Sequence, residues 1–377
     1  LWNTFVHDSM CRKLYSGAIL CHIKLYNIIP LLMKSISPNF FYTAASFAVL
    51  GGLVSCQSRQ KPLNIVYIMT DDHTSQMMSC YDTRYIETPN LDRIAKDGVR
   101  FTNSFVSNSL SGPSRACMLT GKFSHKNGFT DNTTCKFDGT QQTMPKLLLP
   151  GQGDYYNPDF ITQTNDTVNK RGYVTNIITD ESLDWLQNKR DRSKPFCLFI
   201  HHKAIHRNWM ADTCDLNLYE DKEFTYPENF FDTYDGRLAA ASQEMSIAKD
   251  MDLIYDLKMQ RSDKETPLKS LYEQFYGRMD SAQKAVWDKF YTPIIDKFYK
   301  DDLKGEDLVR WKYQRYMRDY AKTVKSLDDN VGKVLDYLEK DCLIIRLSYI
   351  LRIKGSIWEN MGGSINASCM KSQCVPL

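Results

Sequence analysis

The chain has 377 residues, enough for one large α/β domain or for two smaller domains. Apolar residues make up 42% and charged residues 25% of the sequence, as in an ordinary folded protein. The net charge of +3 comes without a basic cluster, so no nucleic-acid partner is expected. The eleven cysteines show neither a C-x-x-C pair nor metal-ligand spacing, which excludes a cysteine-based zinc site.

Two segments precede the folded part. Residues 1–32 come before a better start site and have no clear role, which predicts upstream sequence translated in error. Residues 33–56 have a short basic start, an apolar run from Phe40 to Val54 and the ending Leu-Val-Ser-Cys, which resembles a bacterial lipoprotein signal peptide. The pattern predicts lipidation of Cys56, attachment to the membrane through lipid alone, and a place in the periplasm or on the outer-membrane surface. A short buried helix is the alternative.

The apolar run from Leu63 to Met69 predicts a buried parallel strand, which Thr-Asp-Asp-His follows. Asp71 and Asp72 would lie at the C-terminal end of this strand, where open α/β sheets bind ligands. Because adjacent carboxylates repel each other unless a cation compensates, the pair indicates a metal site. A helix cap or an Asx turn would use the same residues.

A helix is predicted at 88–98, with threonine as its cap, proline in its first turn and glycine at its end. Residues 99–105 then predict a second strand. The segment 111–122 follows and reads Ser-Gly-Pro-Ser-Arg-Ala-Cys-Met-Leu-Thr-Gly-Lys. Its proline suits the first turn of a helix, which places Ser111 just before a helix N-terminus, where free N–H groups favour anions. An ordinary helix start is the alternative.

The pattern Ser-x-Pro-Ser-Arg-x-x-x-Leu-Thr-Gly-Lys resembles the signature of type I, formylglycine-dependent sulfatases, and the segment 88–98 matches a second family segment. The resemblance covers about 62–341. It implies the alkaline phosphatase-like α/β sandwich, with a mostly parallel central sheet. It also implies that a maturation enzyme oxidises Ser111 to formylglycine, whose hydrate attacks the sulfur of a sulfate ester.

The same resemblance implies roles for other residues. Asp71, Asp72 and Ser111 would bind Ca²⁺, the hard, oxygen-seeking ion of the family. Arg115 would hold the diol or the sulfate through charge-assisted hydrogen bonds. His206 would contact the sulfate.

Other histidines receive no catalytic role. His201 and His202, which follow a buried strand predicted at 194–200, are expected to pack or to support the site, and His125 is expected to be structural in its loop. Further along, residues 207–306 predict helices and long loops over one face of the sheet. Apolar residues at helical spacing predict a long helix at 307–339.

The chain departs from the family pattern in two places. The Gly-Lys-x-His motif, whose lysine and histidine serve the sulfate and the diol, is absent, which predicts a deletion near residue 149. After Lys340, the family's Ser-Asp-Gln-Gly strand end is also absent. Combining the third base of each codon with the first two of the next lets residues 350–355 encode Thr-Ser-Asp-Gln-Gly, and the family pattern continues beyond. We infer a reading-frame shift near residue 341, so residues 342–377 are a frame-shifted tail.

These features predict a sulfatase catalytic domain at 57–341 that lacks its last active-site strand and its C-terminal subdomain. The expected function is hydrolysis of a sulfate ester on a glycosaminoglycan or mucin sugar, of the N-acetylglucosamine-6-sulfatase type, with the truncated chain inactive. A phosphatase or phosphodiesterase that uses unmodified Ser111, and a non-catalytic gene remnant or glycan-binding shell, are the alternatives.

Overall fold

The computed structural model describes residues 63–141, 153–162, 166–237 and 246–341, together with the backbone of a strand at 345–350. The chain forms two units, Leu1–Lys61 and Pro62–Leu377, and every described residue belongs to the second. Cys56, the predicted deletion near 149 and residues 351–377 therefore lie outside the described residues. No described helix is both long enough and apolar enough to cross a membrane.

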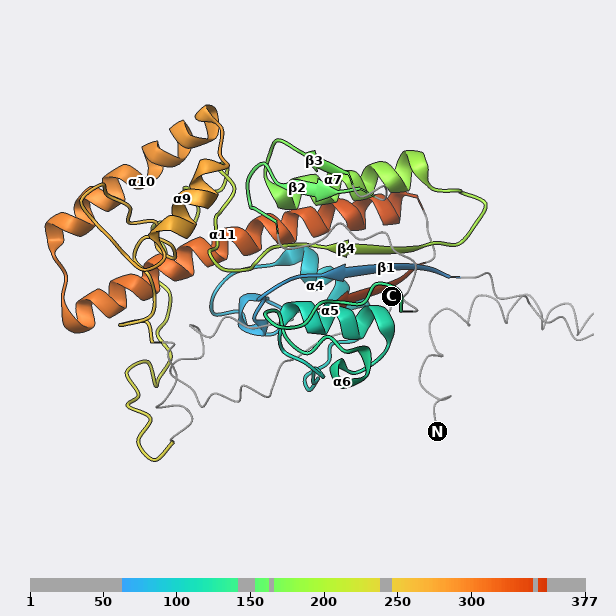
Figure 1. The fold of residues 1–377 in the computed structure, drawn as a ribbon, viewed down its shortest axis with the longest axis horizontal. Coiled ribbons are helices and arrows are strands. Elements are labelled where there is room, and N and C mark those ends of the chain that lie inside the picture. Colours follow the sequence, from blue (N-terminus) through green and yellow to red (C-terminus); the bar gives the residue numbers. More distant parts are fainter. Residues whose placement is uncertain (1–62, 142–152, 163–165, 238–245, 342–344, 351–377) are drawn as a thin grey trace, which may run out of the picture. The chain divides into compact units, whose positions relative to one another are not determined.

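The central sheet of the described residues has three strands, in the order β4 (Cys197–His201), β1 (Asn64–Met69) and β5 (Ile345–Ile350). Both neighbours run parallel to β1, so that Val66 pairs with Leu198 on one side and with Leu347 on the other (Figure 1). β1 and β4 are the two apolar runs that predict buried strands, and both are rich in β-branched and aromatic residues. The predicted α/β class with a parallel sheet is confirmed.

Strand β5 corrects one expectation. The sequence predicts that the sheet lacks a strand after the long helix, but Ile345–Ile350 pairs with β1 along all six residues. The physical reason is the local pattern Ile-Arg-Leu-Ser-Tyr-Ile, in which apolar and polar residues alternate with the period of a strand. Such a segment can pair with the free edge of a parallel sheet even if it is translated in a shifted frame. The hydrogen-bond ladder between strands requires only backbone groups and a compatible pattern of side chains.

The two faces of the sheet are covered differently. Val66, Ile68, Leu198 and Ile200 are at most 2% exposed, in one cluster with residues of α4 (Pro89–Asp97), α7 (Val174–Asp184) and α11 (Gly305–Lys340). The opposite face carries Tyr67, whose hydroxyl donates to Met118 Sδ of α5 (Ser111–Thr120) at 2.7 Å. Figure 1 shows α7 and α11 on one side of the strands and α5, with α6 (Ser124–Asn127), on the other. The helices thus form layers on both sides of the sheet.

Helix α11 spans 36 residues and confirms the predicted long helix. Its apolar residues are buried at the expected spacing, including Tyr320, Val324, Leu327 and Val331, each 0% exposed. The helix also buries charged side chains that the apolar pattern does not indicate, among them Asp319 and Lys322. It therefore contributes both an apolar core and a buried polar network.

The remaining elements are short or lie beyond the sheet. They are the 3-10 turn Ser75–Met77, the antiparallel pair β2 (Asp159–Ile161) and β3 (Thr167–Asn169), the π-helical turn Trp185–Lys189, α9 (Lys269–Gly277) and α10 (Ser281–Asp301). Asp280 caps α10 in a capping box with Gln283. The described residues between β4 and α9 form loops without a helix or strand, in keeping with the prediction of long loops there.

One predicted element is wrong. Residues 99–105 do not form a strand. Val99, Phe101 and Phe105 are 48%, 40% and 71% exposed, so the apolar side chains that suggested a strand have no sheet to join.

Candidate active site

The acidic pair lies where β1 ends. Thr70, Asp71 and His73 are fully buried and Asp72 is 8% exposed. The backbone of Asp71 continues the ladder beyond the strands, because its N–H donates to the Ala204 carbonyl at 3.0 Å and its carbonyl accepts from Ile205 N–H at 2.5 Å. The loop after β1 and the loop after β4 are therefore joined at Asp71 itself.

Ser111 is the first residue of α5, one position inside the helix that it was expected to precede. Its hydroxyl donates to Asp71 Oδ1 at 3.0 Å, and its side chain is buried. The next residue, Gly112, lets the loop 129–132 pack closely against the start of α5, since a Cβ there would lie 2.3 Å from Asn132 Oδ1 and 2.9 Å from the Phe129 ring. The structure thus brings together Ser111 and Asp71, which are 40 residues apart in sequence.

Arg115 lies one helical turn after Ser111. Its Nη2 donates to Asp71 Oδ2 at 3.3 Å, and its Nη1 lies 3.3 Å from His201 Nδ1. Burial, and then the charge of Arg115, lower the pKa of His201 to about 3, so the imidazole is neutral and accepts the hydrogen bond. His201 therefore orients Arg115 and leaves its charge in place.

Lys203 is a buried cation to which the sequence analysis assigned no role. It is 4% exposed, and its ammonium lies 5.1 Å from the Tyr155 ring centroid and 5.8 Å from that of Phe275. Burial lowers its pKa to about 8, while Asp71, Asp154 and Asp72 act in the opposite direction. The signal in the sequence was its place directly after a buried strand, the same place that Asp71 has after β1.

His206 lies on the loop that pairs with Asp71. Its Nδ1 is 2.5 Å from the Arg207 carbonyl, so Nδ1 carries a hydrogen and Nε2 is the acceptor in the neutral ring. The Tyr155 hydroxyl donates to the His206 carbonyl at 2.7 Å and fixes the backbone there. The residue is thus oriented by its neighbours, one position after the Ile205 contact with Asp71.

The described donors fit calcium in part. Asp71, Asp72 and the Ser111 hydroxyl offer the hard oxygens that Ca²⁺ prefers, but the ion takes roughly six to eight of them. Within the described part of the chain, no group of three or more histidine, cysteine, aspartate or glutamate residues could hold a metal. The carboxylates at the end of β1 therefore supply only part of a donor set.

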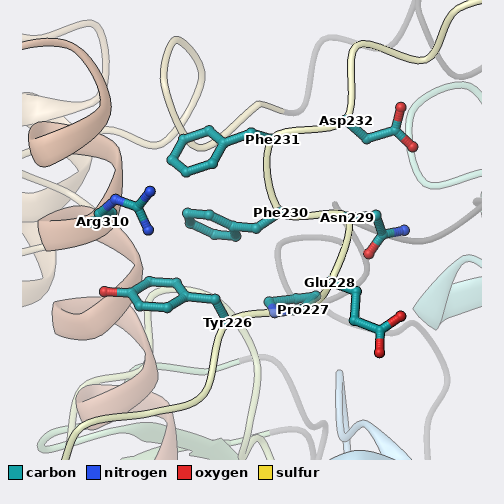
Figure 2. Close-up of a pocket in the computed structure, with 8 residues that line it drawn as sticks. All are labelled: Tyr226, Pro227, Glu228, Asn229, Phe230, Phe231, Asp232 and Arg310. Carbon is teal, nitrogen blue, oxygen red and sulfur yellow. The ribbon is translucent and has the colours of Figure 1, made fainter.

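A separate hollow of about 470 Å³ lies at the loop 226–232 beside α11. Figure 2 shows the rings of Tyr226, Phe230 and Phe231 on the side of Arg310, whose guanidinium lies 4.7 Å from the Phe231 ring centroid. Arg310 is also paired with Glu306. None of the predicted site residues lines this hollow.

The parallel sheet, the acidic end of β1 and the buried serine at the start of α5 define an alkaline phosphatase-like α/β protein. Comparison with known families makes the assignment specific, because the family model described as Sulfatase matches residues 63–149 and 148–348. The chain belongs to the sulfatase family, as the motif at 111–122 predicts.

Known proteins similar to this chain agree. It is 46% identical over 326 residues to an N-acetylglucosamine-6-O-sulfatase of Bacteroides thetaiotaomicron, covering 76% of this chain and 58% of that protein. It is 34% identical over 283 residues to the human N-acetylgalactosamine-6-sulfatase, covering 74% of this chain and 47% of that protein. A solved structure in complex with its substrate D-glucosamine-2-N,6-O-disulfate superposes with a TM-score of 0.75 at 40% identity, over 84% of this chain and 71% of that one. The chain spans about half the length of these curated relatives.

Proposed function

We propose that this chain derives from a glycan sulfatase that removes sulfate from a glucosamine-type sugar, and that the chain as it stands has no turnover. The observation that carries the proposal is the contact of Ser111 Oγ with Asp71, beside Arg115. The similarity to an N-acetylglucosamine-6-O-sulfatase and to the structure with a sulfated glucosamine supports the substrate class. Glycosaminoglycan and mucin sugars contain this unit.

The residues of this chain suggest a division of roles. Asp71 accepts the hydrogen bond of Ser111 and so sets the direction of the side chain that attacks sulfur. Arg115, held by Asp71 and His201, offers N–H groups to the sulfate oxygens. His206, whose Nδ1 is bonded to the Arg207 carbonyl, would use Nε2 to exchange a proton with the reacting oxygen.

Two groups that the unmodified chain does not contain would supply further parts of the chemistry. Formylglycine, made from Ser111 by a maturation enzyme, would supply a hydrated aldehyde as the nucleophile. Asp71, Asp72 and the modified Ser111 side chain would hold Ca²⁺, which neutralises charge on the sulfate. Lys203 adds a buried positive charge near the same carboxylates.

The absence of turnover follows from the loss of groups that would stabilise the negative charge of the transition state. In the transition state, negative charge builds on the sulfate oxygens, and each donor lost typically costs about 2.7–4 kcal/mol. The chain lacks the Gly-Lys-x-His motif, and the predicted frame shift removes the later lysine and two metal ligands. The alignment to the Bacteroides relative extends over 326 positions but includes only 76% of the 377 residues of this chain, so the relative has residues that this chain lacks.

The experiment is an assay of sulfate release from 6-sulfated N-acetylglucosamine and from an aryl sulfate, with Ser111→Ala as the matched control. We expect the chain and its Ser111→Ala variant to release sulfate at the same background rate. Turnover that depends on Ser111 would contradict the proposal for the chain as it stands.

Mass spectrometry of the Ser111 peptide separates the alternatives. Formylglycine lowers the peptide mass by two hydrogens, whereas an unmodified serine together with phosphate-ester hydrolysis would favour the phosphatase alternative. A glycan-binding shell would bind the sulfated sugar without modification or turnover.

A further inference from the structure

Three residues with side chains adopt left-handed backbone conformations in the loops around the site. Asp72 has φ 54°, Trp209 φ 53° and Lys258 φ 64°. This region is unfavourable for residues that carry a Cβ, and it persists only where neighbouring groups hold the backbone. All three residues meet the same turn of α11, at Asp319 and Tyr320.

Tyr320 holds the loop of the acidic pair. Its side chain is fully buried, and its hydroxyl donates to the Asp72 carbonyl at 2.7 Å and accepts from Thr74 N–H at 3.0 Å. One hydroxyl thus bridges the backbone on both sides of His73. The peptide that follows Asp72 cannot turn without breaking these bonds, so the direction of the Asp72 side chain depends on Tyr320.

Asp319 holds the loop of His206 through Lys258. The Lys258 ammonium donates to Asp319 Oδ2 at 3.2 Å, and also to the carbonyls of Asn208 at 2.7 Å and of Trp209 at 3.4 Å. Lys258 and Asp319 are both fully buried. The Trp209 ring packs on the same helix, 6.5 Å from the Tyr320 ring centroid. The backbone that follows His206 is therefore fixed from α11.

We propose that Asp319 and Tyr320 are positioning residues, which hold the acidic loop and the His206 loop in the geometry that the reaction needs. This inference rests on the proposed function, because that reaction is what the two loops are positioned for. The contacts themselves join two consecutive residues of α11 to two loops from different strands. The two loops also pair with each other at Asp71, so a disturbance on one side reaches the other.

The test compares Tyr320→Phe with Tyr313→Phe. Both rings lie on α11 and are at most 1% exposed, but the Tyr313 hydroxyl donates to the Thr225 carbonyl at 2.9 Å, in a different loop. Hydrogen exchange followed by mass spectrometry reports the 70–74 segment in the folded protein. We expect amide exchange there to rise about fivefold to 150-fold in Tyr320→Phe, as for loss of two buried hydrogen bonds, and to stay unchanged in Tyr313→Phe.

A second readout is binding of Tb³⁺, a luminescent substitute for Ca²⁺, to the same two variants. The apparent dissociation constant should rise about threefold to tenfold in Tyr320→Phe only. Equal exchange of the 70–74 segment in both variants overturns the inference, whatever the ion does. Faster exchange in Tyr320→Phe with no ion binding in any variant supports the positioning role and counts against the metal part of the proposed function.

Discussion

Asp319 lies in the buried polar network of α11, and the variant Asp319→Asn tests how much its charge contributes to the stability of the protein. Its carboxylate accepts from Arg315 at 2.5 Å, from Lys258 at 3.2 Å and from the Tyr291 hydroxyl at 3.1 Å, with Lys322 at 3.6 Å. Burial by itself raises the pKa of Asp319, but the neighbouring cations outweigh it and hold that pKa well below its usual range. The carboxylate is therefore charged at neutral pH.

The expected cost follows from what Asp319→Asn leaves behind. The amide keeps the shape of the side chain but loses its charge, so Lys258 remains fully buried without its ionic partner. Breaking one member of a buried pair typically costs about 3–5 kcal/mol. The matched control is Asp329→Asn on the same helix, where the side chains of Lys325 and Asp329 are 33% and 46% exposed. That pair should be worth about 0.2–1 kcal/mol.

Urea unfolding followed by circular dichroism and tryptophan fluorescence measures both variants. We expect Asp319→Asn to lower the free energy of unfolding by about 3 kcal/mol more than Asp329→Asn at pH 7. Because the folded-state pKa of Asp319 is lowered, its contribution is present above the unfolded value and is lost as the pH falls below about 4. Below that pH, the difference in free energy of unfolding between the two variants should become smaller. A loss under about 1 kcal/mol at pH 7, equal to that of the control, would refute the reasoning.

Three further predictions concern pH, metal and export. Burial lowers the pKa of His202 to about 4, so the neutral ring makes its full contribution to stability above about pH 6.5 and loses it as the pH falls towards 4. In His202→Gln, the decrease in the free energy of unfolding between pH 7 and pH 5 should therefore be smaller by up to about 2 kcal/mol. Calorimetry should find weak Ca²⁺ binding, and tight binding that Asp71→Asn abolishes would contradict the partial donor set. Labelling with a fatty-acid analogue should be lost in Cys56→Ala, and equal labelling of both proteins would exclude lipidation there.

Much of the fold could be predicted because its signals are local. An apolar run with a strand's composition gave β1 and placed Asp71 at its end, and the helical spacing of apolar residues gave α11. The contact of Ser111 with Asp71 was implied only through the family motif, since nothing in the spacing of two residues 40 positions apart fixes their distance.

The remaining features depend on tertiary contacts, which a local pattern does not contain. In the sequence, Lys203 resembles any lysine that follows a strand. Its contact with the Tyr155 ring is visible only in the folded chain. Asp319 and Lys258 lie 61 residues apart, and their pairing becomes visible only in the folded chain. Residues 99–105 show that a local pattern can also mislead. The segment is apolar but forms no strand, because an apolar segment needs an available sheet edge to become one.

The two predicted lesions should be separable in a repair experiment, because they remove different groups from the sulfate. Asp71, Ser111 and Arg115 are held by β1, α5 and β4, all within residues that the chain retains. If the two predictions are right, filling the predicted gap near 149 restores the Gly-Lys-x-His pair, and correcting the predicted frame shift near 341 returns the later lysine and the other metal ligands.

Either repair alone leaves at least one donor to the developing charge missing, and each loss costs about 10²- to 10³-fold in rate. Because these donors act on one set of oxygens, their effects are not independent, and a singly repaired chain should stay close to background. Sulfate release should therefore return only in the doubly repaired chain and should disappear again in its Ser111→Ala variant. Turnover in a chain with a single repair would show that the retained cations, Arg115 and Lys203, compensate for the missing ones.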